Sequence, residues 1–424
     1  MFKRFKQAIT RKGTLEQLAT LRSQVDDAPG WTSISGQRHD RDWAEIQELY
    51  SDTLLAWRKN PIAWRIIAIT TDYVTSGRLA ISSPVESLNQ YIHDFWNHPN
   101  NRLDLRLASM VEELSRAGDL FVLLFRNRLD GMSYLRFITK DQVAGIESLE
   151  NDWETEIAYL VHQPGQAEPQ RWLGPAHPQA AEQDALLLHY AVNRPIGALL
   201  GESDLAALIP WLLRYSRMLE DRVRLHWAAR SFLYLVTVPP NKIESKSAQY
   251  AAAPESGSII VKDESEKWET LTPALRGADA AHDMKAVRQM IDAGSGYPPH
   301  WRGEGGDVNL ATAEAMQAPP EKHLARRQAY FAYILQDILF HAYQQAVALG
   351  KAPPLPNDDY STLFTIHLPD VSSRDNLQLA QAAQHMAAAM QTLSQGLQNE
   401  PDEALKQLMR AQVLRAAGET EKTA

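Results

Sequence analysis

The chain contains no cysteine among its 424 residues. Disulfide bridges, thiolate nucleophiles and cysteine-ligated zinc are therefore excluded, and a reducing compartment suits its folding. No stretch approaches the ~18 consecutive apolar residues of a membrane-spanning helix, so we expect no membrane partner. The basic amino-terminal stretch MFKRFKQAITRKG lacks an apolar core and a small-residue cleavage site, so we expect no secretory signal.

Basic residues are fewer than acidic ones, 43 Lys and Arg against 52 Asp and Glu, so the formal net charge is −9. Such a balance argues against a protein that grips nucleic acid through one dominant basic surface. It suits a protein past which DNA slides. Each phosphate that a protein neutralises strengthens salt-dependent binding, so a protein that lets DNA move should neutralise few of them. The hydrophobic content of 44% is that of a folded globular protein, and the length allows about two or three domains.

Catalytic and ligand-binding motifs are missing as well. The thirteen histidines form no HExxH or HxH pattern, so we expect structural or solvated roles for them. The glycines at 303, 305 and 306 lack the lysine of a phosphate-binding loop, and Gly201-Glu202-Ser203 lacks the second glycine of a nucleophile elbow. The acidic run from Asp263 to Glu269 is interrupted by lysines, which is typical of a solvated face. The sequence predicts no catalytic residue, no metal site and no cofactor.

Helical spacing of apolar residues dominates the first part of the chain, followed by extended runs. The pattern predicts a helix pair from Trp43 to Ser76, interrupted at Asn60-Pro61, and then two further helices. A hairpin with an Asp130-Gly131 turn and two more strands should complete an α+β body over about residues 40 to 200. The predicted later helices are 88–96 and 105–116, and the strands are 119–126, 133–138, 156–162 and 185–189.

A long helix is predicted after this body, with Ser203 as its N-cap and Ala206 to Ala229 as its length. Two strands and a second helix should follow, at 232–238, 258–261 and 278–293. A further helix, from about 309 to 349, contains Pro319-Pro320, which should break or kink it. The tail should hold a strand at 363–367 and a polar helical region over 374–417.

Between the last two long helices lies a glycine-rich stretch, GSGYPPHWRGEGGDVNLATAEAMQAPP, from Gly294 to Pro320. We expect a structureless, mobile tongue there. By itself such a tongue is compatible with a lid over an active site, a nucleotide cradle, or a finger that lines a channel.

Four fragments, in this order and spacing, resemble the portal proteins of tailed bacteriophages and prophages. NPIAWRIIAITTDYVTSG resembles an early helix of that family, and AGDLFVLLFRNRLDGMSYLRFITKDQV resembles its wing hairpin. LLLHYAVNRPIGALLGESDL is similar to the passage into its stem helix, and SGYPPHWRGEGGDVNLATAEAM to the passage through its tunnel loop. The chain departs from the pattern where Ile138-Thr139-Lys140 replaces the usual proline, in Trp301 and Arg302, and in a short crown.

The resemblance implies an α+β, mainly helical fold with wing, stem, clip and crown arranged in a ring. The implied division is an N-terminal arm 1–40, a wing 41–203, a first stem helix 204–230, a clip 231–273, a second stem helix 274–293, a tunnel loop 294–310, a long kinked helix 311–350 and a crown region 351–424.

The implied function is that of a ring, usually a dodecamer, at one capsid vertex, which forms the channel for DNA packaging and ejection. Its partners would be further copies of the chain, double-stranded DNA, the terminase motor, the head-tail adaptor, the major capsid protein and the scaffold. It would be located in the virion after assembly in the host bacterial cytoplasm. The candidates for facing the channel are His300, Arg302, Glu304, Asp307 and Asn309. The candidates for the stem or subunit interface are Arg214, Arg217, Arg222 and Arg224, for which pairing with a neighbour's acidic residues and contact with DNA stay equally open.

Two other functions stay open at the level of sequence. One is a nucleotide-using transferase, with residues 294–310 as its active-site lid. The other is a non-viral scaffold that uses the same ring, as in gene-transfer particles. A large closed oligomer would indicate the conduit, whereas a monomer or dimer with a ligand-dependent lid would indicate the enzyme.

Overall fold

The computed structural model describes residues 41–77, 79–230, 233–249, 266–271, 277–303, 310–369 and 371, together with 384–385, 388 and 391–392. The chain divides into two compact units, residues 1–369 and 370–424. In the second unit the described residues from 384 onward are helical. The predicted arm 1–40, the strand expected at 258–261 and most of the helical region expected over 374–417 lie outside the described residues.

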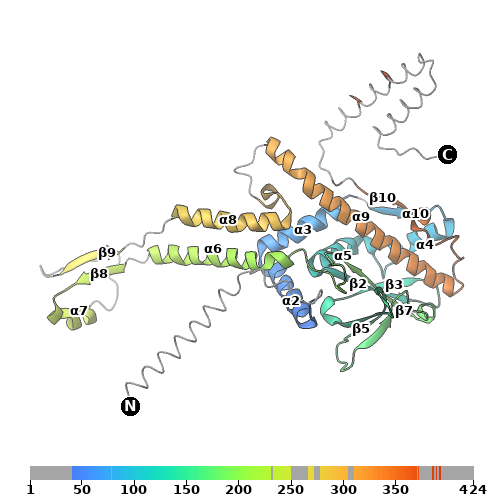
Figure 1. The fold of residues 1–424 in the computed structure, drawn as a ribbon, viewed down its shortest axis with the longest axis horizontal. Coiled ribbons are helices and arrows are strands. Elements are labelled where there is room, and N and C mark those ends of the chain that lie inside the picture. Colours follow the sequence, from blue (N-terminus) through green and yellow to red (C-terminus); the bar gives the residue numbers. More distant parts are fainter. Residues whose placement is uncertain are drawn as a thin grey trace. The chain divides into compact units, whose positions relative to one another are not determined.

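The described part of the first unit begins with the four predicted helices (Figure 1). Asp42 and Glu45 form a capping box at the start of α2, and Asn60 both ends α2 and accepts hydrogen bonds from the first turn of α3, which begins with Pro61. Gly118 ends the fourth helix with a positive φ of 83°. The helices are α2 (Trp43–Lys59), α3 (Pro61–Thr75), α4 (Glu86–Asn97) and α5 (Leu103–Ala117).

Two three-stranded antiparallel sheets follow, with strand orders β3-β2-β7 and β4-β5-β6. The predicted hairpin is present, because Phe121 pairs with Ile138 and Arg126 with Ser133. β4 and β6 were not expected from the sequence. The strands are β2 (Asp119–Arg126), β3 (Ser133–Ile138), β4 (Val143–Leu149), β5 (Asp152–Val161), β6 (Gln170–Leu173) and β7 (Ala185–Ala191), and the short 3-10 helices η1 (Lys140–Gln142) and η2 (Ala180–Glu182) lie among them.

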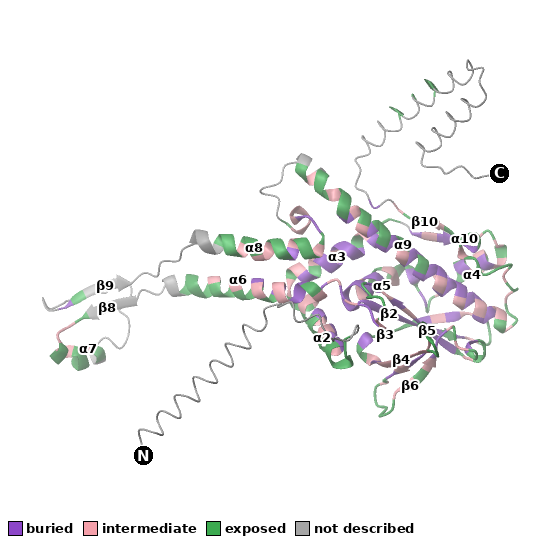
Figure 2. Ribbon diagram, in the orientation of Figure 1, coloured by how far each residue is buried: buried purple, intermediate pink, exposed green. Residues whose placement is uncertain are grey.

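The main core joins two stretches that are far apart in sequence. Residues between Val74 and Val192 pack there against the middle of α9 (Leu310–Ala348) and against α10 (Tyr360–Leu363). A small sheet closes the same unit, since β1 (Ala80–Ser82) pairs with β10 (Thr365–His367). Figure 2 shows this body largely purple where α3, α9 and β2 meet. This body is therefore completed only by the end of the first unit.

The chain leaves this body between the two stretches. The 3-10 turn η3 (Ala206–Leu208) leads into α6 (Ile209–Arg230), and α8 (Gly277–Ser295) returns beside it (Figure 1). Arg288 of α8 donates to the Tyr215 hydroxyl of α6, at 3.4 Å. Both helices agree with the predicted pair, although Ser203 is not the N-cap of α6: its hydroxyl accepts from the amide of Leu205, the residue before η3.

Between α6 and α8 the chain forms β8 (Leu233–Thr237), the turn η4 (Pro240–Lys242), the short helix α7 (Ile243–Gln249) and β9 (Lys267–Leu271). β8 and β9 pair as a two-stranded antiparallel sheet. The partner of the predicted first strand is thus found at 267–271, inside the acidic stretch that was interpreted as a solvated face. Lys267 is exposed, as that interpretation expects, but the interpretation was wrong for Glu266, which is buried and pairs with Lys246 at 2.6 Å.

The expectation of a structureless stretch after Gly294 was wrong for its first part, because α8 runs to Ser295 and the 3-10 helix η5 (Pro299–Arg302) follows. α9 runs through Pro319-Pro320, so the helix is not broken there, and a kink at the two prolines stays a prediction. Among the residues that the structure describes, no helix has both the length and the apolarity needed to cross a bilayer.

Candidate functional site

The turn that follows α8 is packed against α3. Trp301 stacks on Tyr73 with the ring centroids 4.8 Å apart and the planes 10° from parallel, and Arg65 donates to the Trp301 carbonyl at 3.3 Å. The hydroxyls of Tyr297 and Thr70 lie 2.6 Å apart. Burial raises the pKa of Tyr297 to about 12, so the phenol stays protonated and this hydrogen bond persists at neutral pH. Aromatic and polar contacts therefore fix the first part of the predicted tunnel loop.

The predicted channel-facing residues divide into two groups. Arg302 is paired with Asp292 of α8, and only 4% of its side chain is exposed in the single chain. His300 is half-buried, with its ring edge-on to Trp301. Glu304, Asp307 and Asn309 lie outside the described residues. Arg302 thus ties the turn to α8, and the channel-facing role of the five residues stays a prediction.

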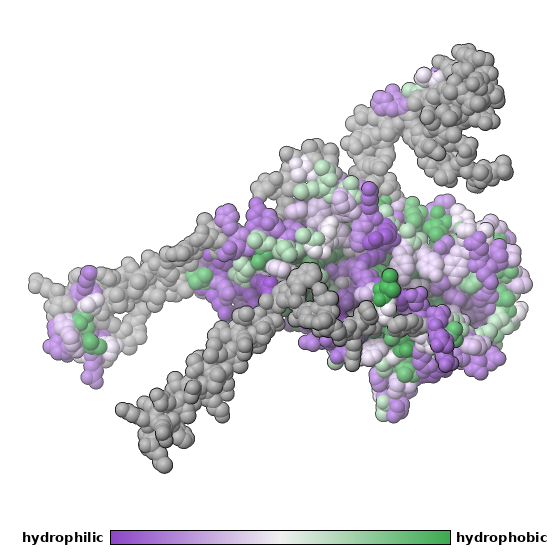
Figure 3. All heavy atoms as spheres, in the orientation of Figure 1, coloured by the Kyte–Doolittle hydropathy of each residue, from purple (hydrophilic) through white to green (hydrophobic). Residues whose placement is uncertain are grey.

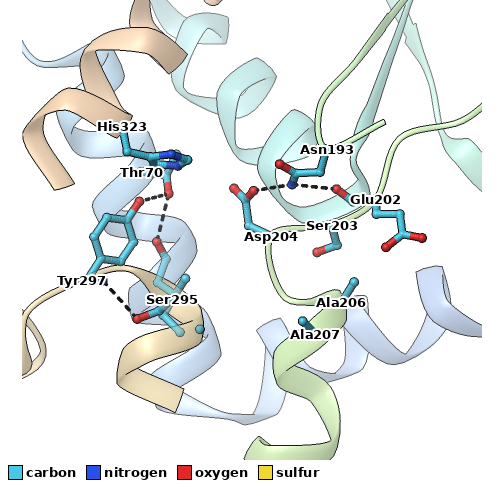
Figure 4. Close-up of a pocket in the computed structure, with 12 residues that line it drawn as sticks. Thr70, Asn193, Glu202, Ser203, Asp204, Ala206, Ala207, Ser295, Tyr297 and His323 are labelled. Carbon is cyan, nitrogen blue, oxygen red and sulfur yellow. Dashed lines mark hydrogen bonds between the residues drawn. The ribbon is translucent and has the colours of Figure 1, made fainter. Parts of the chain in front are cut away.

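A cavity of about 280 Å³ lies next to this turn, where α3, η3, the end of α8 and α9 meet. Figure 4 shows Asp204, Asn193 and Ser203 on one side of it, and Thr70, Tyr297 and His323 on the other. The sides come from segments that are far apart in sequence. The cavity therefore exists only when η3, the end of α8 and α9 are assembled on α3.

Asp204 is the anchor of the cavity. Its Oδ1 accepts from Asn193 at 2.7 Å and from Arg327 of α9 at 2.9 Å, and its Oδ2 accepts from the Ser115 hydroxyl of α5. The Arg327 side chain is 7% exposed. A buried ion pair of this kind leaves an uncompensated charge when one partner is removed, so Asp204 and Arg327 hold the segment that leads into η3 and α6 to α9.

The chemistry of the cavity is that of a structural junction. Burial, and then the charge of Arg327, lower the pKa of His323, so its imidazole is neutral at physiological pH. In the described part of the chain no serine hydroxyl donates to a histidine, as a nucleophile and base pair would require. No cluster of acidic residues and histidines with the geometry of a metal site is found among the same residues.

A second ionic cluster, largely buried, holds the other side of the 201–204 segment. His189 of β7 lies between two carboxylates, with Nε2 2.9 Å from Asp119 and Nδ1 2.8 Å from Glu156. Lys140 of η1 lies 2.6 Å from the other Asp119 oxygen and donates to the Gly201 carbonyl at 2.7 Å. The Gly201 amide in turn donates to Asp119 at 2.7 Å. Residues of the sheets and of η1 therefore hold the chain at Gly201, shortly before η3 and α6 begin.

The charges in this cluster decide the protonation of His189. Burial by itself would lower the pKa of the imidazole, but the charge of Glu156 and the hydrogen bonds to Asp119 and Glu156 raise it to about 9. Burial likewise opposes ionisation of Glu156, whose pKa is nevertheless lowered by His189, by Tyr159 and by Arg194. His189 is therefore an imidazolium at neutral pH that donates from both ring nitrogens.

Two glycines allow the backbone at residue 118 to contact the backbone at residues 201 and 202. A side chain at Gly118 would collide with the backbone of Glu202, and one at Gly201 would collide with the carbonyl of Gly118. Val192 donates to that same carbonyl at 2.8 Å. The glycines in two of the sequence fragments, AGDL and LLGESD, are thus explained by direct contact between two backbone segments.

The predicted stem arginines all lie on α6. Arg214 lies over the ring of Trp211 at 5.0 Å, and Arg224 pairs with Glu220 one turn earlier in the same helix at 2.6 Å. Arg217 is exposed and Arg222 is half-buried. The structure therefore spreads the four along one helix rather than gathering them into one site, and their role between subunits stays a prediction.

Sequence reasoning missed the residues that form the junction. Asp204 was expected only to favour a helix start, and neither Arg327 nor His189 stood out, because their partners are distant in sequence. The one usable signal was the pair of glycines at 118 and 201, each next to an acidic residue.

Chains from two structures of gene transfer agent (GTA) particles share this fold. A chain from the virion of a native GTA particle matches with a TM-score of 0.51 at 16% identity, covering 80% of this chain and 89% of its own length. A chain from the neck of an empty GTA particle, computed with C6 symmetry, matches with a TM-score of 0.54 at 16% identity, covering 80% and 90%.

A third match is a portal protein of the HK97 phage family from Corynebacterium diphtheriae, with a TM-score of 0.32 at 12% identity, covering 63% of this chain and 84% of its own. No protein-family model matches the chain, and no curated protein matches its sequence. The resemblance to portal proteins that the sequence predicts is confirmed at the level of the fold.

Proposed function

We propose that this chain is the portal subunit of a tailed phage, a prophage or a gene-transfer particle. Copies of it close into a ring at one capsid vertex, and double-stranded DNA passes through the ring during packaging and ejection. The observation that carries the proposal is the fold shared with a chain from a GTA neck that was computed with C6 symmetry. The role is structural and requires no cofactor.

The surface of the two stem helices supports the proposal. Leu219, Val223 and Trp227 of α6 are 40%, 54% and 71% exposed, at the four-residue spacing that places them on one side of the helix. Met290 of α8 is 47% exposed. Green spheres lie among purple ones over this helix pair in Figure 3. Apolar side chains that a single chain leaves in water are expected to pack against neighbouring copies.

The β8-β9 sheet supports it as well. Two strands form a marginal sheet in water, and their outer edges can pair with further strands. We assign this sheet to the clip, which would complete itself with neighbouring subunits and meet the adaptor and the terminase motor. The remaining contacts, with the major capsid protein and the scaffold, belong to the outer surface of the ring.

Electron microscopy of the purified chain tests the proposal directly. We expect a closed ring with a central hole in top views, and mass photometry should give a particle of about the mass of twelve copies. Single compact particles at all protein and salt concentrations would refute it. A monomer or dimer whose residues 294–310 become protected when a nucleotide is added would instead favour the transferase.

A charge placed on the stem tests the role of the apolar residues. Val223→Lys should reduce the fraction of chain in rings at least tenfold, because an ammonium would replace a packed side chain at the interface. Asp221→Lys is the matched control, since residue 221 is exposed and lies about 200° around the helix from Val223. If Val223→Lys forms rings as readily as Asp221→Lys, the stem does not use this side of α6.

A further inference from the structure

Three arginines gather where α5 begins beside β3, and we call them the arginine patch: Arg102, Arg106 and Arg136. Arg106 and Arg136 donate to the same two carbonyls, at distances of 2.7 and 2.6 Å to Leu135 and 3.2 Å each to Asn100. Arg102 donates to the Pro99 carbonyl at 3.0 Å. The guanidinium groups therefore bond to backbone oxygens and lie close to one another.

The charges of the patch are not neutralised within the chain. Among the described residues no carboxylate lies within ion-pairing distance of any of the three arginines. Burial, together with the charges of Arg136 and Arg102, lowers the pKa of Arg106, as expected for like charges held together. A chain with a net charge of −9 thus concentrates three positive charges at one place. Such an arrangement needs an acidic partner.

The surroundings of the patch favour a protein partner over a phosphate backbone. Arg106 lies over the ring of Phe137, which is 38% exposed, and the neighbouring Leu105 is 73% exposed. Arginine beside exposed aromatic and aliphatic side chains is the composition of the centre of a protein interface. The partner should therefore carry several carboxylates around at least one apolar side chain.

The same chain presents such a segment at the turn between β4 and β5, residues 149–154, which we call the acidic tip. Glu150, Asp152 and Glu154 are exposed, and no lysine or arginine of the described residues pairs with them. Leu149, next to Glu150, is 48% exposed. The tip thus places three negative charges beside an exposed apolar side chain, which complements the three positive charges and the apolar rim of the patch.

We propose that the acidic tip of one copy docks on the arginine patch of the next copy in the ring. This inference rests on the proposed portal function. In a ring each copy meets its neighbour through two different surfaces, which must be complementary to each other. The patch and the tip meet this condition, since each lacks an ionic partner in its own chain and each matches the other in charge and in apolar content.

Charge reversal in two places tests the docking. The patch variant is Arg102→Glu with Arg136→Glu, and the tip variant is Glu150→Lys with Glu154→Lys. Each alone places like charges opposite one another and should lower the fraction of chain in rings at least tenfold at 0.15 M salt, measured by mass photometry. The control, Arg58→Glu with Lys351→Glu, makes the same change of net charge as the patch variant at exposed positions outside the patch and the tip, and should form rings normally.

Mixing gives the decisive result. In an equal mixture of the patch and tip variants, alternating copies put opposite charges at every contact, so rings should return although neither variant forms them alone. The fourfold variant should also form rings. Circular dichroism and the urea midpoint check that each variant folds. If a reversal variant fails to fold, Arg102→Gln with Arg136→Gln should still lower the ring fraction about threefold.

The outcomes separate this inference from the function on which it rests. Normal rings from both single-reversal variants would overturn the docking while leaving the portal function intact. The absence of rings from the unmodified chain would overturn both. Reversal variants that fold but are not rescued by mixing would show that the two surfaces do not meet each other.

Discussion

The buried imidazolium at His189 makes the stability of the body depend on pH in a predictable direction. Its pKa in the folded chain is about 9, against 6.5 for an unperturbed histidine. Because the folded pKa is the higher one, the stabilisation is fully present below pH 6.5 and is lost as the pH rises through 9. Above that, a neutral ring would lie between the ionised Asp119 and Glu156.

The size of the effect follows from the same shift. A difference of about 2.5 pKa units corresponds to about 3 kcal/mol of folding free energy. Across pH 6.5 to 9 the folded chain binds about one proton more than the unfolded chain, so the free energy of unfolding should fall by about 1.4 kcal/mol per pH unit. That is a large fraction of the typical stability of a domain.

Urea unfolding of the full chain, at one protein concentration and in steps from pH 6 to 10, measures this slope. His189→Gln should remove the steep fall between pH 6.5 and 9. It should also lower the free energy of unfolding at pH 6.5 by about 3 to 5 kcal/mol, since two buried carboxylates lose their cation. His93→Gln, at a side chain that is 74% exposed, is the control. Equal slopes for the unmodified chain and His189→Gln would refute the reasoning.

Three substitutions test the packing described above. Gly118→Ala should destabilise the chain by about 2 kcal/mol more than Gly197→Ala, because both sites have a positive φ (83° and 90°) but only a side chain at 118 would collide with backbone. Urea midpoints compare the two variants, and equal losses of stability would contradict the backbone contact at Gly118. Phe331→Ala should lower the free energy of unfolding by about 3 to 5 kcal/mol, since Phe331 is fully buried in the main core, and a loss below 1 kcal/mol would place it outside that core. Trp301→Ala should speed amide exchange in η5 at least tenfold while leaving α10 unchanged, and unaltered exchange would show that the stacking on α3 does not hold the turn.

Local signals were enough to predict most helices and the central hairpin. A few consecutive residues are enough to recognise each helix boundary: the capping box at Asp42, the Asn60-Pro61 boundary and the glycine after α5. The Asp130-Gly131 turn fixed the β2-β3 hairpin in the same way, and the shared fold followed from the order of such fragments.

The parts that were missed depend on distant partners. β1 has three residues, and its partner β10 lies about 285 positions later, so neither sequence shows that they pair. β4 contains Gly145 and shifts its register in several places, which removes the alternation that identifies a strand. Asp204 and Arg327 are 123 positions apart, and no local pattern joins them. The many Gly and Pro residues of the tongue predict a structureless segment, and nothing in its local sequence indicates that Tyr297 and Trp301 stack on each other.

The division of the main core between residues 74–192 and 331–364 has a consequence for biosynthesis. When residues 74–192 have left the ribosome, the apolar residues of β2 and α5 have no α9 to pack against. The core cannot form until the segment from α6 to η5 has also been translated. Contacts that span so much sequence slow folding. During this interval the apolar residues of the incomplete core are exposed to solvent, and α6 and α8 are synthesised before the body from which they extend is complete.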